Sequence, residues 1–89
     1  MQTLRKVCFD TSSHGYIQVK RYELNELNLA DKISNYSYQN GSSVYLEEDV
    51  DAEKYINAQK NKGVKIWLDP SDSKSQALIH SYKRYNINN

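Results

Sequence analysis

The segment ISNYSYQNGSSVYLEED, residues 33–49, decides the fold of this chain. At its centre stands the pair Asn40-Gly41, which readily takes the positive φ angles of a two-residue type I′ turn. The residues on either side are rich in tyrosine and β-branched side chains, which are common in strands. The segment therefore predicts a tyrosine-rich β-hairpin with arms at 33–38 and 43–47.

The register of this hairpin predicts two distinct faces. With Asn40 and Gly41 at the central positions of the turn, Tyr36 lies opposite Tyr45. Side chains alternate along a strand, so each arm divides between the faces. We expect the apolar face to join the core and the tyrosine face to be exposed for binding. The tyrosine face carries Tyr36, Tyr38, Ser43 and Tyr45, and the apolar face carries Ser37, Val44 and Leu46.

Hydrophobic spacing and turn residues predict the elements around the hairpin. The order is typical of a single α+β domain over residues 1–89, with a frayed end at 86–89. We expect a small antiparallel or mixed sheet of about five strands, covered by two or three short helices. The expected elements are strands at 4–9, 16–19 and 64–68, helices at 20–29 and 52–62, and a last helix capped by Ser71 or Ser73 with Leu78, Tyr82 and Tyr85 on one face.

Composition excludes several classes of protein. The 12 basic and 11 acidic side chains give a net charge of +1, so we expect no nucleic-acid partner. Cys8 is the only cysteine and cannot form an internal disulfide, which favours a reducing cytoplasmic location. No run approaches the about 20 apolar residues of a membrane span, so we expect no membrane partner.

Acidic residues and histidines give two candidate chemistries. The acidic run could hold a divalent cation, or it could cap the helix that follows it. His14 and His80 could join Glu47 or Asp49 as a metal site or as an acid and base pair, or they could be a turn histidine and an exposed helix histidine. Both alternatives stay open for each group. The acidic run consists of Glu47, Glu48, Asp49 and Asp51.

Basic side chains near the tyrosines suggest a second kind of site. Tyrosine rings could stack on a nucleotide-like ligand while Arg21, Lys83 or Arg84 holds its phosphates. Alternatively, Tyr36 and Tyr45 are only a cross-strand pair, and the basic residues belong to a solvated surface.

Three motifs resemble a family of small uncharacterised proteins encoded by bacteriophages and mobile elements. They are His14-Gly15-Tyr16, the run from Ile33 to Tyr38 and the run from Val44 to Asp51. The family pattern closes with Ile-Arg-x-Tyr, where this chain has Ile79-His80-Ser81-Tyr82. The resemblance implies a phage or plasmid accessory protein in the host cytoplasm and implies no reaction.

The leading hypothesis is a non-enzymatic phage protein that inhibits a host defence or metabolic protein through the tyrosine hairpin and its acidic shoulder. The alternative is a homo-oligomeric protein that sequesters a nucleotide-like ligand, and the third is a metal-assisted hydrolase using His14, Glu47 and Asp49. We expect no cofactor. The expected binding residues are His14, Tyr16, Arg21, Tyr36, Tyr38, Tyr45, Glu47, Asp49, Lys83 and Arg84.

Overall fold

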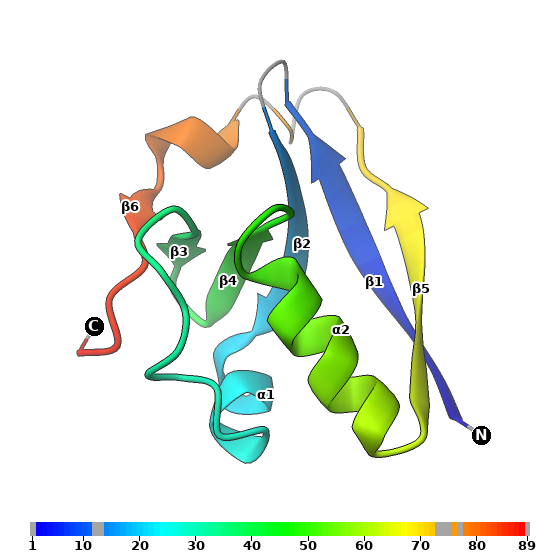
Figure 1. Cartoon of the computed structure of the whole chain (residues 1–89). Coiled ribbons are helices and arrows are strands. Elements are labelled where there is room, and N and C mark those ends of the chain that lie inside the picture. The colour runs from blue at the N-terminus through cyan, green and yellow to red at the C-terminus, as the bar shows by residue number, and fades with distance from the viewer. Residues whose placement is uncertain (1, 12–13, 73–75, 77, 89) are drawn as a thin grey trace.

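The fold is α+β, with one six-stranded mixed sheet (Figure 1). A computed structural model describes residues 2–11, 14–72, 76 and 78–88. The strands lie in the order β5-β1-β2-β4-β3-β6, so the sheet has one strand more than the sequence predicts. The elements are β1 Gln2–Asp10, β2 Gly15–Lys20, α1 Arg21–Glu26, β3 Tyr38–Asn40, β4 Ser43–Glu47, α2 Ala52–Asn61, β5 Val64–Pro70, the 3₁₀ turn η1 Ile79–Ser81 and β6 Lys83–Arg84.

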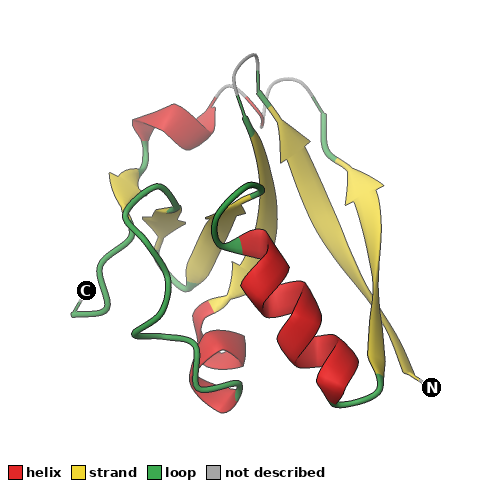
Figure 2. Cartoon of the chain, viewed as in Figure 1, coloured by secondary structure: helices red, strands yellow, loops and turns green. Residues whose placement is uncertain are grey.

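Pairing in the sheet is antiparallel except at one end. β2 pairs antiparallel with both β1 and β4, whereas β5 pairs parallel with β1 along its whole length. The chain reaches β5 from β4 through α2, as parallel strands require a crossover connection. Figure 2 shows α2 crossing in front of the sheet. None of the helices described is long and apolar enough to cross a membrane.

The helical face of the sheet forms the first core. The apolar face predicted for the hairpin lies here, because Val44 and Leu46 are fully buried. Leu24 of α1 and Tyr55 of α2 pack against them, each with no exposed surface. The prediction that this face joins the core is confirmed. The remaining buried members are Ile17, Val19, Leu29, Ala52 and Tyr85.

The opposite face forms a second core, and this corrects the prediction of an exposed tyrosine face. Tyr38 and Tyr45 are each only 6% exposed. They pack with Phe9 and Tyr16, and Ile79 of η1 covers them. The prediction assigned these tyrosines to the correct face, but it missed that residues far along the chain close over that face.

The hairpin turn is also displaced by one residue from its predicted position. Asn40 pairs with Ser43 and Tyr38 with Tyr45, so Gly41 and Ser42 occupy the two central positions. Gly41 has φ of 61°, whereas Ser42 has no positive φ. A positive φ at the first central position alone is the pattern of a type II′ turn, which places glycine there. The predicted type I′ turn at Asn40-Gly41 is therefore wrong.

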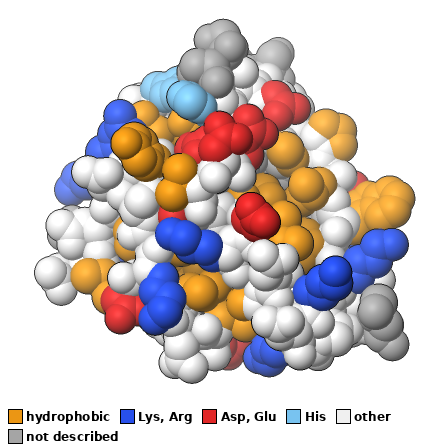
Figure 3. Space-filling model, viewed as in Figure 1, with side chains coloured by type: hydrophobic (Ala, Val, Ile, Leu, Met, Phe, Trp, Pro, Cys, Tyr) orange, Lys and Arg blue, Asp and Glu red, His pale blue; other side chains and the backbone are white. Residues whose placement is uncertain are grey.

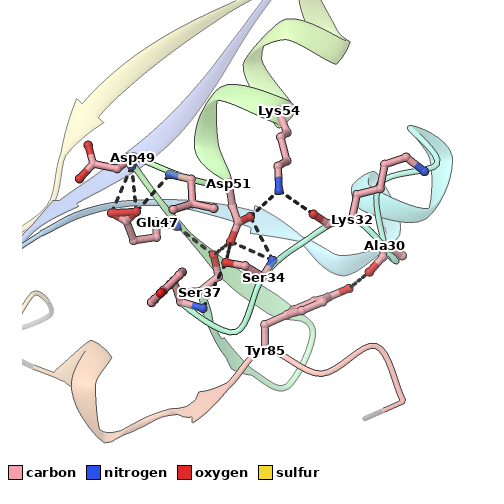
Figure 4. Close-up of polar contacts among 11 residues, drawn as sticks. Ala30, Lys32, Ser34, Ser37, Glu47, Asp49, Asp51, Lys54 and Tyr85 are labelled. Carbon is pink, nitrogen blue, oxygen red and sulfur yellow. Dashed lines mark hydrogen bonds and ion pairs between the residues drawn. The ribbon is translucent and has the colours of Figure 1, made fainter.

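Residues 33–37 form a loop with a turn at 35–36 rather than the predicted strand, and Asp51 binds this loop (Figure 4). The buried Asp51 carboxylate accepts hydrogen bonds from the Ser34 N–H at 3.0 Å and from the Ser37 hydroxyl at 2.5 Å. Lys54 Nζ lies 3.1 Å from the same carboxylate. Asp51 precedes α2 as the sequence predicts, but its side chain makes no capping hydrogen bond to that helix.

The end of the chain departs from the predicted helix. Leu78 is helical, but η1 follows it directly and Lys83–Arg84 is a strand beside β3. Tyr85 therefore lies beyond the helix, where it inserts into the first core and donates its hydroxyl to the Ala30 carbonyl at 2.5 Å. The proposed cap at Ser73 lies outside the described residues.

A second buried carboxylate joins α1, α2 and β1. Glu23 accepts hydrogen bonds from Lys6 Nζ at 2.6 Å, from the Lys20 N–H at 2.7 Å and from the Tyr55 hydroxyl at 2.7 Å. Burial alone would raise the pKa of Glu23, but these donors outweigh burial and lower it. Burial and the Glu23 carboxylate raise the pKa of Tyr55, so its hydroxyl stays a donor.

We expect Asp51→Ala to lower the free energy of unfolding by about 3–5 kcal/mol, because it leaves buried polar groups without their charged acceptor. Urea denaturation would measure this loss. Asp31→Ala is the matched control, since Asp31 is exposed, and it should change stability by less than about 0.5 kcal/mol. Equal stability of the two variants would contradict the role given to Asp51.

Stability should also depend on pH through Asp51. Burial would raise its pKa, but hydrogen bonds from Ser37 and Ser34 outweigh burial and hold the pKa below its ordinary value of 3.8. A carboxyl whose pKa is lower in the folded state stabilises that state above about pH 4 and loses this contribution as the pH falls through the lowered pKa. Unfolding measured across this range should show a shallower pH dependence for Asp51→Asn than for the wild type.

We expect Tyr55→Phe to cost about 1.5–3 kcal/mol, the range for a hydrogen bond to a charged group. Tyr22→Phe is its control, because Tyr22 is 62% exposed. Thermal and urea unfolding of both variants would test this difference, and an unchanged Tyr55→Phe protein would refute it.

Candidate ligand-binding groove

A hollow of about 570 Å³ opens where the start of β2, the end of β4 and the η1–β6 segment meet. Figure 3 shows histidine surface, in pale blue, directly beside acidic surface, in red. The chain has only two histidines, and both line this hollow, which we call the groove. Its lining residues are His14, Tyr16, Tyr36, Tyr38, Glu47, Asp49, Val50, His80 and Arg84.

Aromatic rings connect the two histidines. Tyr16 makes edge-to-face contacts with His14 at 6.5 Å and with His80 at 6.0 Å between ring centroids. Tyr38 adds an edge-to-face contact to Tyr16 at 5.6 Å. Burial raises the pKa of the Tyr16 hydroxyl, and Tyr38 and Glu47 act in the same direction, so this hydroxyl remains a donor. The floor of the groove is therefore aromatic, and the Tyr16 hydroxyl in it is a hydrogen-bond donor.

Glu47, at the end of β4, lies beside His14. Its buried carboxylate accepts hydrogen bonds from the backbone N–H groups of Asp49 at 2.9 Å and Val50 at 3.1 Å. His14 Nδ1 lies 3.6 Å from Glu47 Oε2. Glu47 points to the tyrosine face, as alternation along the strand predicts. Its negative charge is therefore already stabilised by fixed backbone donors.

The predicted acidic cluster does not act as one group. One ligand atom each from His14, Glu47 and Asp49 lies within 4.8 Å of the others, a spacing that allows a divalent metal. Glu48 lies elsewhere, with its carboxylate against Gly15, and Asp51 serves the loop at 33–37. The Asp49 carboxylate has no hydrogen-bond or ion-pair partner among the described residues.

His80 reaches the groove from the 3₁₀ turn η1, and Arg84 reaches it from the following strand β6. The Tyr38 hydroxyl lies 3.3 Å from His80 Nδ1. The Arg84 guanidinium stacks over the Tyr38 ring, with Cζ at 4.6 Å from the centroid. Its Nη1 donates to the Asn35 carbonyl at 3.3 Å. One tyrosine thus positions both an imidazole and a permanent positive charge.

The structure brings most of the predicted binding residues to this groove and separates the others. Tyr45 lies in the second core against Phe9 and Tyr82. Arg21 and Lys83 line a different hollow of about 430 Å³. Val50 and His80 line the groove although they are not among the predicted binding residues. The signal for His80 in the sequence is its residue type, since histidine is a common metal ligand and a common acid or base.

No family model matches this chain, and comparisons with curated proteins and with solved structures also give no match. The resemblance to phage and mobile-element proteins therefore stays a prediction. Any assignment of function depends on the geometry of the chain itself.

Two of the three tyrosines on which the exposed-face hypothesis relied should behave differently when replaced. Tyr45→Ala should lower the free energy of unfolding by about 3–5 kcal/mol, because it empties an aromatic site in the core. Tyr36 is 60% exposed, so Tyr36→Ala should stay within about 0.5 kcal/mol of the wild type. Chemical denaturation measures both, and a fully stable Tyr45→Ala protein would show that the second core is wrongly assigned.

Proposed function

We propose that the protein binds a small, planar, phosphate-bearing ligand of the nucleotide class in the groove. The observation that carries this proposal is that both histidines and Arg84 line one groove, whose floor is formed by tyrosine rings. The hollow has a volume of about 570 Å³, and small-molecule sites commonly measure about 300–1,000 Å³. This proposal develops the ligand-binding alternative from the sequence.

A phosphate is the group that this set of donors suits best. Arg84 supplies a permanent charge with several N–H donors, and arginine binds phosphate oxygens through paired hydrogen bonds. The imidazoles of His14 and His80 are exposed and can add further N–H donors. The stacked position of Arg84 on Tyr38 limits the freedom of its guanidinium. We therefore place the phosphate between Arg84 and His80.

The rest of the ligand would meet aromatic and carboxylate groups. Tyr36 is exposed at the edge of the groove and offers a face on which a base can stack. The Asp49 carboxylate is a free acceptor for a hydroxyl or amino group. Glu47 repels an anion less than an unpaired carboxylate would, because backbone N–H groups already bind it. The mixed charges thus favour a ligand with an anionic end and a donor end.

The hypothesis of an inhibited host protein stays a prediction, as do the phage setting and self-association. The burial of Tyr38 and Tyr45 removes two of its three aromatic anchors and leaves Tyr36 at the edge of the groove. The metal-assisted hydrolase also stays a prediction, with His14, Glu47 and Asp49 close enough to hold an ion. Ligand binding is the function for which the geometry offers the most contacts.

A thermal-shift panel of nucleoside phosphates and cyclic dinucleotides tests the proposal. A ligand present at 100 times its Kd should stabilise the protein by about 2.7 kcal/mol, because it binds the folded state only. Arg84→Ala should weaken binding about tenfold or more, since a hydrogen bond to a charged group contributes about 1.5–3 kcal/mol.

Lys83→Ala is the matched control, because Lys83 is adjacent in sequence but lines the other hollow. It should bind like the wild type. Absence of a shift across the whole panel, or equal losses in the two variants, would overturn the proposal.

A further inference from the structure

Each histidine of the groove has one ring nitrogen beside a partner and one with no partner among the described residues. Nδ1 of His14 lies 3.6 Å from the Glu47 carboxylate, and Nδ1 of His80 lies 3.3 Å from the Tyr38 hydroxyl. Across the described parts of the chain, neither Nε2 has a hydrogen-bond partner. An imidazole that is oriented at Nδ1 and open at Nε2 has the arrangement of a general acid or base.

We infer that the groove cleaves the phosphodiester bond of a short ribonucleotide, such as a diribonucleotide or a cyclic dinucleotide, without a metal. This inference rests on the proposed function, because the substrate occupies the same groove. His14 acts as the base, His80 as the acid, and Arg84 binds the phosphate.

The carboxylate beside His14 assigns it the role of base. When the His14 Nε2 accepts a proton, the ring becomes an imidazolium, and Glu47 stabilises that charge across 3.6 Å. The partner of His80 is a neutral hydroxyl, so no carboxylate competes for its proton at Nδ1. Nε2 of His80 can therefore carry an N–H that is given to a leaving oxygen.

The step balances with the groups present. His14 Nε2 takes the proton of the ribose 2′-hydroxyl, and the 2′-oxygen forms a bond to phosphorus. The bond between phosphorus and the 5′-oxygen breaks, and His80 Nε2–H gives its proton to that oxygen. The products are a 2′,3′-cyclic phosphate and a 5′-hydroxyl, with no change in oxidation state. Proton exchange with water restores both imidazoles.

Two further contacts support this reaction over simple binding. Arg84 is anchored over Tyr38 at 4.6 Å, the same tyrosine whose hydroxyl meets His80, so the phosphate site and the acid share one support. A fixed guanidinium stabilises the charge that develops on the phosphate oxygens during displacement. Asp49 lines the same groove as His14 and can accept a hydrogen bond from a second hydroxyl of the substrate.

The test incubates the full chain with diribonucleotides and cyclic dinucleotides in the presence of EDTA, and detects 2′,3′-cyclic phosphate products by mass spectrometry. Binding is measured in parallel with analogues that carry 2′-deoxyribose at the scissile position, which cannot react. We expect cleavage of the ribonucleotides and binding of both kinds of molecule.

His14→Ala and His80→Ala should each slow cleavage by about 100-fold or more, in line with the loss of a general acid or base, and this factor should exceed any weakening of deoxy-analogue binding that the lost imidazole causes. Both residues are exposed, so melting curves should match the wild type. Added imidazole should restore part of the activity of His14→Ala, which a purely structural role would not allow. Lys83→Ala should cleave normally.

The outcomes separate the two proposals. Binding of the deoxy analogue without cleavage of the ribonucleotide would overturn the catalytic inference and leave the proposed binding function intact. Failure of both molecules to bind would overturn both proposals. Activity that EDTA abolishes, or that survives in the His14→Ala, His80→Ala double variant, would also overturn the acid and base assignment.

Discussion

The rest of the structure depends on the hydrogen bonds that the buried Asp51 carboxylate accepts (Figure 4). This carboxylate binds Ser34 and Ser37, and the Ser37 hydroxyl in turn accepts the Glu47 N–H at 3.0 Å. The Ser37 carbonyl accepts the Tyr85 N–H at 2.8 Å. A single buried charge thereby positions the approach to β3, the end of β4 and the segment after β6. The first two of these elements line the groove, through Tyr36, Tyr38 and Glu47.

Placing a charge at this centre is costly unless every oxygen has a donor, because a carboxylate loses its hydration on burial. The chain meets this requirement with two serines, a backbone N–H and Lys54. In return, these hydrogen bonds are directional and fix the positions of the groups that donate them. Apolar packing alone would allow the loop before β3 to slide, whereas hydrogen bonds to one carboxylate specify a single arrangement. The tyrosines that follow then have defined positions on the sheet.

The sequence predicts those structural features that depend on residues close together in the chain. Apolar spacing identifies α2, and alternation assigns Val44 and Tyr45 to opposite faces of the sheet. The sequence cannot show that residues 33–37 do not form a strand. The cause is Asp51, whose side chain contacts Ser37 although the two residues are 14 positions apart. Nor can the sequence show that Ile79 covers Tyr38 and Tyr45, since this contact forms only when a later segment of the folded chain packs on that face of the sheet. His14 and His80 likewise come to line one groove only when these distant segments pack together.

The shortness of β6 has a consequence for how the groove opens. This edge strand has only two residues and pairs with β3 alone, yet its segment carries Arg84. Short edge elements with exposed hydrogen bonds open by local unfolding at a lower free energy than the core. One wall of the groove can therefore detach while the sheet persists. An occupant that contacts this wall would slow amide hydrogen exchange there, so occupancy and the order of this edge are thermodynamically linked.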